Sequence, residues 1–410
     1  MSDKIKILFH PSDLAGVGHF RSIWPAQEMQ KQFKDDFDIK INAHINFNDL
    51  NALKKYDIIH FHRALGPHEK IKEIFKELKD AGVTLIMDLD DYWMPPTTHP
   101  MYYAVKEQKI TEKIIDTIKM SDYVTTTTNI FAKEIKRYNQ NVLVMPNAID
   151  TNHKMWKKED VEKTDKLRVS WIGGSSHLED LKLLENSIHR LNSDSNVSDK
   201  YQFILCGFDT RGHITEINKQ TGQQKTRKIL PHETVWNKFE KIVTSNYKSI
   251  DSEEYVSWLK KYKNEKYKVH AKDLKYVRRW TLPLTQYGKH YNYCDVCLAP
   301  LTKNIFNKVK SELKIIEAGM TKKVLIAQDY GIYKELLEDG ETGFLINDSR
   351  NHKDWYKKIK YLIQNPSEVE RISNNLYELV KDKYSLKSVT EDRVKIYKQL
   401  HKENKLVTVD

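Results

Sequence analysis

Short apolar runs alternate with longer amphipathic segments along the first part of the chain. "KIKILFH", "YDIIHFH" and "VTLIMDLDD" have the pattern of buried strands, and "EKIKEIFKELKDAG" spaces its apolar residues as one face of a helix. The same alternation restarts at "LRVSWIGG", after a charged linker, and continues through "YCDVCLAPL", "SELKIIEAGM" and "KVLIAQD". Buried strands that alternate with helices predict parallel sheets covered by helices. We therefore expect an α/β protein with two doubly wound, Rossmann-like domains that face each other across a cleft.

The linker and the interruptions of this pattern place the domain boundaries. We expect an N-terminal domain over residues 1–160 and a C-terminal domain over residues 161–384. Residues 385–410 are predicted to form a helix that packs back on the N-terminal domain. A polar stretch at about residues 211–279 interrupts the second domain, and we predict it to be a basic, mostly helical insertion.

Composition narrows the class of protein. A chain of 410 residues exceeds one typical core, which agrees with two domains. No apolar run reaches the roughly 18 residues that a transmembrane helix needs, and "MSDKIKILFH" enters a strand without a signal peptide. Three cysteines do not make a disulfide framework, so we expect a reducing cytoplasm. Cys294 and Cys297 form a CxxC, which we interpret as packing residues rather than zinc ligands.

The formal charge of +11 is distributed unevenly. Residues 201–290 hold 18 Lys and Arg against 9 Asp and Glu, a net charge of +9, so the rest of the chain contributes only +2. Aromatic residues are interleaved with these cations. A basic, aromatic stretch of this kind indicates a polyanionic partner.

Two polar motifs follow predicted strands of the first domain. "HPSDLAGVGHFRS" has Gly16 and Gly18, with Arg21 where a dinucleotide fingerprint would have its third glycine. The glycines allow close approach of a ligand and the arginine suits a phosphate, although a tight turn beside a solvated arginine is the alternative. "DIIHFHRALGP" ends a strand with His60 and His62 on one face and Arg63 on the other, and we expect His62 to lie in the cleft.

An acidic cluster ends another strand of the first domain. "MDLDDYW" carries Asp88, Asp90 and Asp91, which could bind a metal, act as a base, orient a hydroxyl group or cap the following turn. A metal is the least favoured of these uses because no further ligand cluster accompanies the three aspartates.

Two motifs in the second half indicate anion binding. "SWIGGSSHLEDL" places Gly173, Gly174 and Ser175 between a strand and a helix, where free N–H groups can hold a phosphate. "FNKVKSELKIIEAG" puts Lys308 and Lys310 at the positive end of a helix that we predict to begin with Ser311 as N-cap. These lysines suit the helix if an anionic group caps it.

Together these motifs resemble the retaining, nucleotide-sugar-dependent glycosyltransferases of the GT-B fold, the family 4 group in particular. The resemblance extends over almost the whole chain, because the motifs that carry it occur in the family's order: "GVGHFR", "DIIHFHRALGP", "VLVMPNAID", "WIGGSSH" and "APLTKNIFNKVKSELKIIEAG". It implies that two Rossmann-like domains clasp a nucleotide-diphosphate sugar, with the acceptor on the N-terminal side and the donor on the C-terminal side.

The resemblance also assigns roles to residues. Glu317 matches the second glutamate of a closing motif, which binds the nucleotide ribose, whereas Val309 stands where the first glutamate belongs. His62 matches a cleft histidine beside the transferred sugar. We assign catalysis to His62 and Asp90. The residues that we assign to donor binding are Gly16, Gly18, Arg21, Gly173, Gly174, Ser175, Lys310, Ser311, Lys314 and Glu317.

The implied reaction retains the anomeric configuration by front-face attack, with the leaving diphosphate helping to deprotonate the acceptor. Such a reaction depends on positioning and charge stabilisation. The family generally needs no metal, so we expect no metal site, no cofactor and a nucleotide-diphosphate sugar, UDP-linked, as co-substrate.

Three interpretations of the acceptor stay open. The favoured one is hydroxymethylated cytosine in duplex DNA, as for certain bacteriophage enzymes, with the base extruded to expose its hydroxyl group. The second is a lipid-linked or surface glycan, with peripheral contact to an anionic membrane. The third is a non-catalytic nucleic-acid-binding protein. The residues that we assign to the acceptor are Arg63, Asp91, Arg227, Lys228, Lys260, Lys261, Arg278 and Arg279.

Overall fold

The computed structural model describes residues 4–209, 211–217, 221–230, 233–244 and 274–407, and the chain divides into two compact units. The N-terminal unit comprises Met1–Thr151, Lys303–Glu317 and Glu378–Asp410, and the C-terminal unit comprises Asn152–Thr302 and Ala318–Tyr377. We expected residues 303–317 in the second domain. Their contacts place them in the N-terminal unit, where the Val309 side chain is buried in the core.

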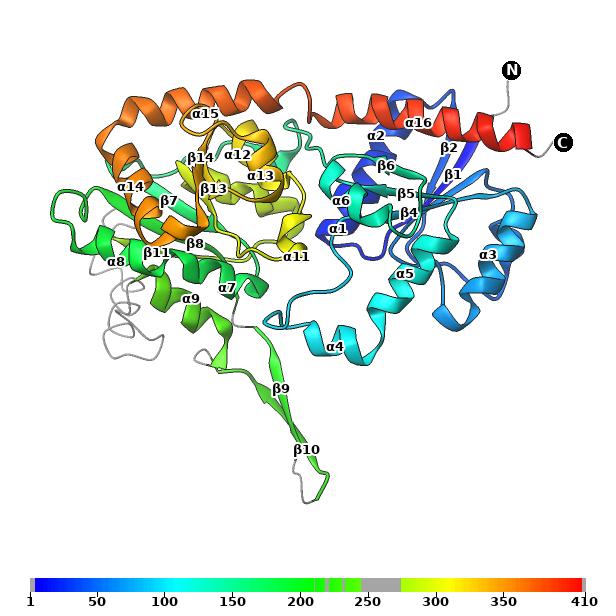
Figure 1. The fold of residues 1–410 in the computed structure, drawn as a ribbon, viewed down its shortest axis with the longest axis horizontal. Coiled ribbons are helices and arrows are strands. Elements are labelled where there is room, and N and C mark those ends of the chain that lie inside the picture. The colour runs from blue at the N-terminus through cyan, green and yellow to red at the C-terminus, as the bar shows by residue number, and fades with distance from the viewer. Residues whose placement is uncertain (1–3, 210, 218–220, 231–232, 245–273, 408–410) are drawn as a thin grey trace. The chain divides into compact units, whose positions relative to one another are not determined.

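The N-terminal unit is built on a six-stranded parallel sheet with the strand order β2-β1-β3-β4-β5-β6 (Figure 1). Its strands are β1 (Ile5–His10), β2 (Phe37–Ile41), β3 (Ile58–His62), β4 (Thr84–Leu89), β5 (Tyr123–Thr126) and β6 (Val142–Val144). Strands β3 and β4 are buried along their whole length, as expected for strands covered on both faces. The predicted parallel α/β architecture is confirmed for this half.

Helices cover both faces of this sheet. The longer ones are α2 (Trp24–Gln32), α3 (Ile71–Asp80), α5 (Ile110–Met120), α6 (Asn129–Ile135) and α16 (Leu386–Val407); the short ones are α1 (Gly16–Gly18), the π-helix η1 (His19–Ile23), α4 (Tyr102–Glu107) and α11 (Ile305–Lys308). Helices α2 and α16 pack on one face through Met29, Val394 and Tyr397. Helices α3 and α5 pack on the other through Leu78 and Ile118. The last helix therefore belongs to the core of the N-terminal unit.

One amphipathic segment is divided into two helices. The apolar spacing of "VKEQKITEKIIDTIKMS" is that of one continuous helix, whereas the structure has α4 and α5 separated at Lys109. Lys109 adopts a left-handed backbone conformation with φ of 53°, which ends the first helix and redirects the chain.

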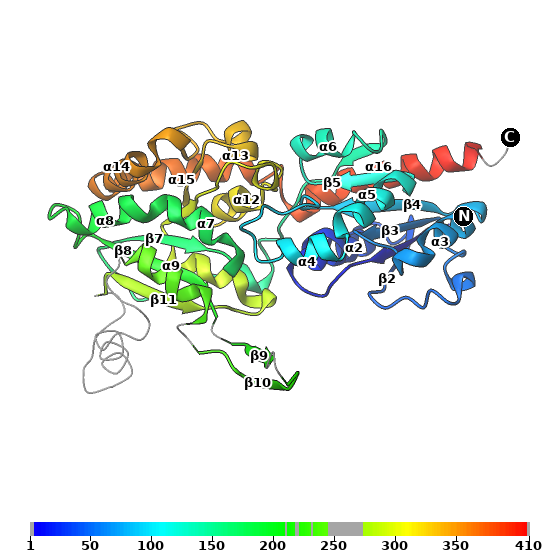
Figure 2. The same ribbon diagram turned by 60° about the horizontal axis from the view of Figure 1, so that its bottom comes forward.

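The C-terminal unit has a second six-stranded parallel sheet, with the order β11-β8-β7-β12-β13-β14. Its strands are β7 (Leu167–Ile172), β8 (Tyr201–Phe208), β11 (Tyr276–Trp280), β12 (Val296–Ala299), β13 (Val324–Gln328) and β14 (Phe344–Ile346). Its helices are α7 (Leu178–Leu181), α8 (Glu185–Ser193), α9 (Val235–Val243), α12 (Leu313–Met320), α13 (Gly331–Leu336), α14 (Asn351–Gln364) and α15 (Pro366–Val380), of which α12 and α15 continue into the N-terminal unit (Figure 2). The core packs Ile188, Leu205, Val296 and Trp355.

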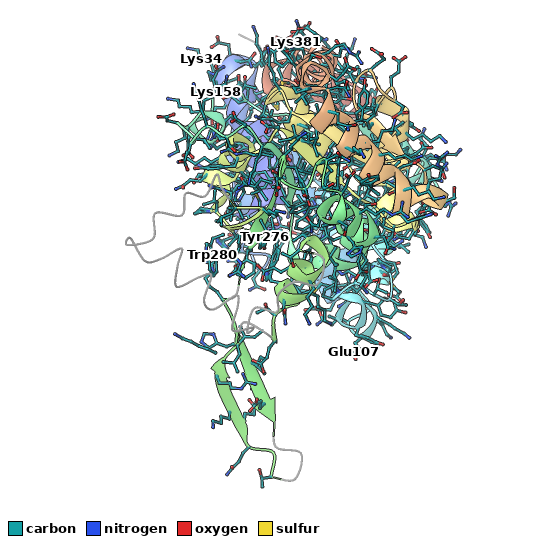
Figure 3. All side chains as sticks on the ribbon, turned by 90° about the vertical axis from the view of Figure 1, so that its left-hand side faces the viewer. Lys34, Glu107, Lys158, Tyr276, Trp280 and Lys381 are labelled. Carbon is teal, nitrogen blue, oxygen red and sulfur yellow. The ribbon has the colours of Figure 1, made fainter. Side chains whose placement is uncertain are left out.

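The described part of the expected insertion differs from the mostly helical prediction. It begins with a two-stranded antiparallel hairpin of β9 (His213–Ile217) and β10 (Gln224–Lys228), which extends away from the unit in Figures 1 and 3. Strand β11 forms the edge of the main sheet beside β8. The β-branched residues of "HITEI" favour a strand, but "QKTRK" contains only one such residue and has little strand signal of its own.

Two smaller expectations also concern the fold. Cys206, Cys294 and Cys297 are buried and form no disulfide bond, which agrees with a packing role. Over the residues that the structure describes, no helix is both long and apolar enough to cross a membrane.

Candidate active site

The turn after β1 is closed by Asp13. Asp13 Oδ1 accepts hydrogen bonds from the backbone N–H groups of Ala15 at 2.8 Å and Gly18 at 3.1 Å. A Cβ at Gly18 would lie 1.9 Å from the Asp13 carbonyl oxygen, so only glycine fits there. A Cβ at Gly16 would have no neighbour within 4 Å. The local reason for glycine at position 18 is therefore the fold of the turn itself.

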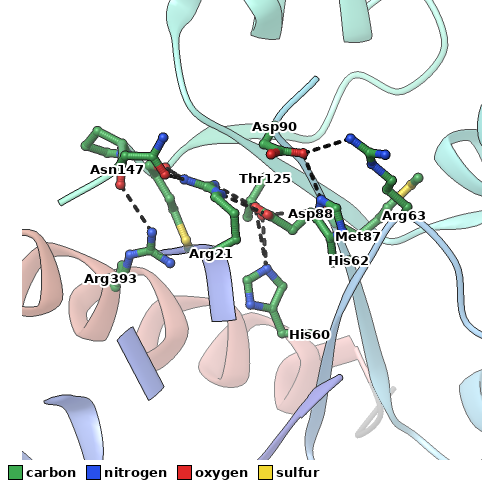
Figure 4. Close-up of polar contacts among 12 residues, drawn as sticks. Arg21, His60, His62, Arg63, Met87, Asp88, Asp90, Thr125, Asn147 and Arg393 are labelled. Carbon is green, nitrogen blue, oxygen red and sulfur yellow. Dashed lines mark hydrogen bonds and ion pairs between the residues drawn. The ribbon is translucent and has the colours of Figure 1, made fainter. Parts of the chain in front are cut away.

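Arg21 is not available to a donor phosphate in this structure. Its guanidinium is 1% exposed and forms a bidentate pair with Asp88, with Nε at 2.9 Å and Nη2 at 2.7 Å from the two carboxylate oxygens. Its Nη1 donates to the Met145 carbonyl oxygen at 2.7 Å and to Asn147 Oδ1 at 3.1 Å (Figure 4). Our prediction for Arg21 is thus corrected to a buried brace between strand ends, where pairing with Asp88 offsets the cost of burying its charge.

Asp88 terminates a buried chain of hydrogen bonds. Thr125 Oγ1 donates to Asp88 Oδ1 at 2.6 Å and lies 3.0 Å from His60 Nε2, while Tyr397 of α16 lies 2.9 Å from His60 Nδ1. Burial lowers the pKa of His60 to about 3, so the imidazole is neutral. Burial opposes ionisation of Asp88, but Arg21 outweighs it and lowers the pKa of Asp88 to about 2. In the neutral tautomer, Tyr397 donates to Nδ1 and Nε2–H donates to Thr125.

His62, the predicted catalytic histidine, lies between Ser12 and Asp90. The Nδ1 atom is 2.7 Å from Ser12 Oγ, and Nε2 is 2.9 Å from Asp90 Oδ1. Burial raises the pKa of Asp90, but the His62 contact, Arg63 and Arg21 together bring it far below its usual range. An ionised Asp90 can only accept, so Nε2 of His62 carries a proton, while the Ser12 hydroxyl group lies close both to Nδ1 and to Asp13 Oδ2, at 3.1 Å. His62 is 1% exposed, whereas Ser12 is exposed.

The residue after His62 is held in a strained turn. Arg63 has φ of 63°, and the Ala64 N–H donates to the His62 carbonyl oxygen at 2.8 Å, which closes a three-residue turn. A non-glycine residue in such a conformation costs about 1–3 kcal/mol and is found most often at functional sites. The turn directs the Arg63 side chain to Asp90, at 3.2 Å, and to Asp91, at 3.7 Å.

Two predicted cations therefore meet at the acidic cluster. Lys310 Nζ lies 3.7 Å from Asp91 Oδ1 and 4.7 Å from the centre of the Phe306 ring. The Arg63 side chain is 39% exposed, yet its Nε is buried and has no hydrogen-bond partner among the described residues. The structure thus brings together Ser12, His62, Arg63, Asp90, Asp91 and Lys310 at the carboxyl ends of β1, β3 and β4.

Helix α12 begins later than predicted. It starts at Leu313, and the Glu312 carbonyl oxygen accepts from the Ile316 N–H at 3.1 Å, so Glu312 rather than Ser311 is the first capping position. Lys314 Nζ lies 2.9 Å from Glu317 Oε2. The Glu317 side chain is 0% exposed and that of Lys314 is partly exposed. Glu317 is therefore a buried carboxylate at the position that the resemblance assigns to ribose binding.

Glu312 is an unpredicted member of this region. Its Oε1 accepts from the Asn147 N–H at 2.7 Å, and its Oε2 has no hydrogen-bond partner in the described part of the chain. Burial raises the pKa of Glu312 to about 7. The sequence showed Glu312 only as a residue suited to a helix N-terminus, because its distance in sequence from "VMPNAID" conceals the contact.

The glycine turn of the C-terminal unit is tightly packed. A Cβ at Gly173 would lie 2.5 Å from the Trp171 ring, and Gly207, with φ of 101°, has no room for a Cβ beside the Gly173 carbonyl oxygen. Gly174 and Ser175 are exposed, and a Cβ at Gly174 would have no neighbour within 4 Å. The turn thus presents only backbone and small side chains at the carboxyl end of β7.

Two of the cations assigned to the acceptor form ion pairs within the C-terminal unit. Arg227 pairs with Glu216 at 2.8 Å and with Glu233 at 2.7 Å across the base of the hairpin. Arg278 is buried, its Nε donates to Glu240 at 2.7 Å, and its guanidinium lies 3.8 Å from the centre of the Phe208 ring. These two are corrected to structural roles.

The remaining acceptor candidates differ. Arg279 stacks on the Tyr293 ring at 3.3 Å, and Lys228 is exposed. Lys260 and Lys261 lie outside the described residues. Trp236 is buried in the core of the C-terminal unit, whereas Trp280 is 53% exposed. Figure 3 labels Tyr276 and Trp280, both on β11.

The acidic residues of the site form no metal-binding cluster among the described residues. In the parts of the chain that the structure describes, no group of three or more His, Cys, Asp or Glu side chains is arranged to hold a metal ion. Asp88 and Asp90 instead pair with arginine and histidine.

Comparison with known proteins identifies the class. Residues 259–379 match the family model of glycosyl transferases group 1, a segment that includes Lys310, Lys314 and Glu317. The protein is a glycosyltransferase with the GT-B fold. No curated protein sequence matches the chain.

Solved structures show the same fold over the full length of this glycosyltransferase. A sucrose-phosphate synthase from Thermosynechococcus elongatus is 11% identical, covers 97% of this chain and 99% of its own, and has a TM-score of 0.58. HepE from Anabaena, in complex with UDP and glucose, is 12% identical, with 97% and 100% coverage and a TM-score of 0.58. A glycosyltransferase from Rickettsia africae is 13% identical, with 97% and 98% coverage and a TM-score of 0.58.

Proposed function

We propose that this glycosyltransferase moves a sugar from a UDP-linked donor to a hydroxyl group of its acceptor, with retention of the anomeric configuration. The observation that carries the proposal is that the segment matched to group 1 glycosyltransferases contains Glu317, whose buried carboxylate is bonded to Lys314. HepE, which shares the fold, was solved with UDP and glucose, so UDP is the first nucleotide to test.

Glu317 and Lys310 are the proposed donor ligands. A buried carboxylate can accept hydrogen bonds from ribose hydroxyl groups, and Lys310 can neutralise a diphosphate oxygen. A charge-assisted hydrogen bond contributes about 1.5–3 kcal/mol, which corresponds to roughly ten- to a hundredfold in affinity. Glu317→Ala is therefore expected to weaken UDP binding by that factor. The exposed Glu335 on α13 provides the matched control, since Glu335→Ala should leave UDP affinity unchanged.

His62 is the proposed contact to the transferred sugar. Asp90 holds its Nε2, and the exposed Ser12 hydroxyl group lies at its Nδ1. Because Asp90 has a strongly lowered pKa, it is a weak base, and we assign it the orientation of His62 and Arg63 instead of proton abstraction. The acceptor hydroxyl proton then passes to the leaving diphosphate, which departs as the new glycosidic bond forms on the same face.

The direct experiment incubates the purified protein with a panel of nucleotide sugars and candidate acceptors. Release of UDP together with a glycosylated product is expected, and the coupling constant of the anomeric proton should show the configuration of the donor. Inversion would overturn the retaining mechanism alone. Failure to bind UDP in calorimetric titration would overturn the donor assignment.

Duplex DNA stays the proposed acceptor, on the observation that residues 201–290 carry a net charge of +9. The pairing of Arg227 and Arg278 removes two of the proposed phosphate contacts and leaves Lys228, Arg279, Lys260 and Lys261 as candidates. Weighing nucleosides after digestion of hydroxymethylated and plain DNA separates this acceptor from a glycan.

A further inference from the structure

His177, in the glycine turn of the C-terminal unit, is held by a buried aspartate. It ends the short 3-10 helix Ser175–His177 that follows Gly174. Its Nδ1 lies 2.8 Å from Asp180 Oδ2. The other oxygen of Asp180 accepts from both the N–H of Thr302, at 2.7 Å, and its hydroxyl group, at 2.8 Å. Both carboxylate oxygens are therefore fixed.

The hydrogen bonds to Asp180 determine which atom carries the proton between Asp180 and Nδ1 of His177. Burial raises the pKa of Asp180, but the hydrogen bonds from His177 and Thr302 outweigh it and lower the pKa overall. Ionised Asp180 can only accept, so Nδ1 of His177 carries a proton. No polar contact to Nε2 is found among the described residues, and the side chain is 29% exposed. A carboxylate that holds one imidazole nitrogen orients the other toward a ligand, as in many histidine sites.

The topology of the sheet places this pair where ligands bind. In the order β11-β8-β7-β12-β13-β14, the chain proceeds from β7 toward β8 on one side and from β12 toward β13 on the other. The order therefore reverses between β7 and β12, and open α/β sheets bind ligands at the carboxyl ends of the strands at such a point. His177 and Asp180 follow β7, and Thr302 follows β12. The hydrogen bonds thus join the two strand ends that border the reversal point.

The composition of the turn indicates the chemistry of the ligand. Gly174, Ser175 and Ser176 supply backbone N–H groups and carry no charged side chain, whereas the Gly173 N–H donates to the Cys206 carbonyl oxygen, so His177 is the first ionisable residue after β7. Small residues with accessible N–H groups favour anions. A histidine that is protonated at both nitrogens adds a charged donor to the same turn, which suits a phosphate oxygen.

We propose that His177 binds the diphosphate of the nucleotide by donating an Nε2–H hydrogen bond to a phosphate oxygen, with Asp180 as its positioning residue. The inference rests on the proposed UDP-linked donor. It assigns to a histidine a contact that the sequence motifs gave to lysines and backbone amides, and it requires the imidazole to hold two protons in the complex.

The test compares UDP with uridine, which lacks the phosphates. Calorimetric titrations would use the wild-type protein, His177→Ala, His177→Gln, Asp180→Asn and the control His189→Ala, an exposed histidine on α8. We expect His177→Ala to weaken UDP roughly ten- to a hundredfold without changing uridine affinity. The amide of His177→Gln should restore part of the loss, and Asp180→Asn should weaken UDP less than His177→Ala does. His189→Ala should match the wild type.

Unchanged UDP affinity in His177→Ala, or equal losses for UDP and uridine, would overturn the inference while leaving the proposed donor intact. If the wild-type protein binds no UDP, the proposed donor fails and this inference fails with it.

Discussion

The backbone N–H of Asn147 donates a hydrogen bond of 2.7 Å to the buried carboxylate of Glu312, 165 residues further along the chain. Asn147 belongs to the motif "VMPNAID" and Glu312 to "NKVKSELK", two segments that pointed separately to the same family. Arg21, Lys383 and Tyr384 act electrostatically with Glu312. Since the carboxyl group is buried and only partly hydrogen-bonded, its ionisation should be visible in the stability of the protein.

Glu312→Gln is expected to remove a pH dependence of stability. The folded pKa of about 7 exceeds the ordinary value of 4.5, so the folded state holds a proton that the unfolded state has lost between these two values. The contribution of Glu312 is therefore fully present below pH 4.5 and is lost as the pH rises through 7, an effect of about 3 kcal/mol. Glutamine keeps an acceptor for Asn147 and does not titrate. Chemical denaturation from pH 5 to 8 should show the variant equal to the wild type at pH 5 and more stable at pH 8.

The exposed Glu335 supplies the control for this comparison, because Glu335→Gln should leave the pH profile of the wild type unchanged. Parallel profiles for the wild type and Glu312→Gln would mean that Glu312 is already ionised at pH 5.

The buried pair of Arg21 and Asp88 predicts a large loss of stability. Asp88→Asn leaves the guanidinium charge buried without a counter-ion, which costs about 3–5 kcal/mol. Tyr397→Phe removes the hydroxyl group that contacts His60 and Arg393 but leaves no buried charge without its counter-ion, at a cost of about 1 kcal/mol. Because the pKa of Asp88 is about 2, its stabilisation is present above the ordinary value of 3.8 and is lost as the pH falls toward 2. Urea denaturation measures the free energy of unfolding of both variants and its decrease in the wild type at low pH.

Tyr103→Phe is the matched control for Tyr397→Phe, since Tyr103 is 69% exposed and should contribute almost nothing. Equal losses for Asp88→Asn and Tyr397→Phe would show that the ion pair does not stabilise the unit.

The two sheets and most of their helices could be predicted because their signals are local in the sequence. Apolar runs and helical spacing located both sheets, because strands such as β3 and β4 are buried on both faces and read as continuous apolar runs. The partners of polar residues were not local. Arg21 appeared suited to a phosphate, and only the fold shows that Asp88, 67 residues away, binds it. Likewise the i to i+3 spacing of His177 and Asp180 was visible, but Thr302 was not.

The proposed sugar contact predicts different outcomes for His62 and Ser12. His62→Ala should lower turnover with little change in UDP affinity, because the histidine contacts the sugar and not the nucleotide. Ser12→Ala should lower turnover less, since His62 Nδ1 loses its contact with the Ser12 hydroxyl group while Asp90 still holds Nε2 of the ring. Steady-state kinetics with UDP titration checks both. Normal turnover in His62→Ala would reduce the histidine to a packing residue.

The DNA acceptor predicts a steep dependence of binding on salt. Each phosphate neutralised should contribute a slope of about 0.9 log units of affinity per log unit of salt. Reversing Lys260 and Lys261 to Glu should flatten the slope and leave UDP binding intact. Reversal of the exposed Lys353 and Lys357 on α14, an equal change of charge, should retain more of the slope. Undetectable binding to duplex DNA at low ionic strength would favour the glycan acceptor instead.

The strained conformation of Arg63 predicts that substitutions there change stability and transfer activity independently. Its φ of 63° suits glycine better than any side chain, so Arg63→Gly relieves backbone strain of about 1–3 kcal/mol. The same change removes a partly exposed ion pair with Asp90, worth about 0–1 kcal/mol, and adds flexibility to the unfolded chain at a cost of about 0.4–1 kcal/mol. The variant should therefore be as stable as the wild type or slightly more stable.

The activity of the same variant tests the role of the side chain. If the Arg63 guanidinium and its buried Nε contact the acceptor, sugar transfer to the acceptor should fall while UDP affinity persists. Arg63→Ala, which keeps the strain and loses the side chain, should transfer as poorly as Arg63→Gly but unfold more easily. Full transfer activity in both variants would show that the strained turn serves only to close the end of β3.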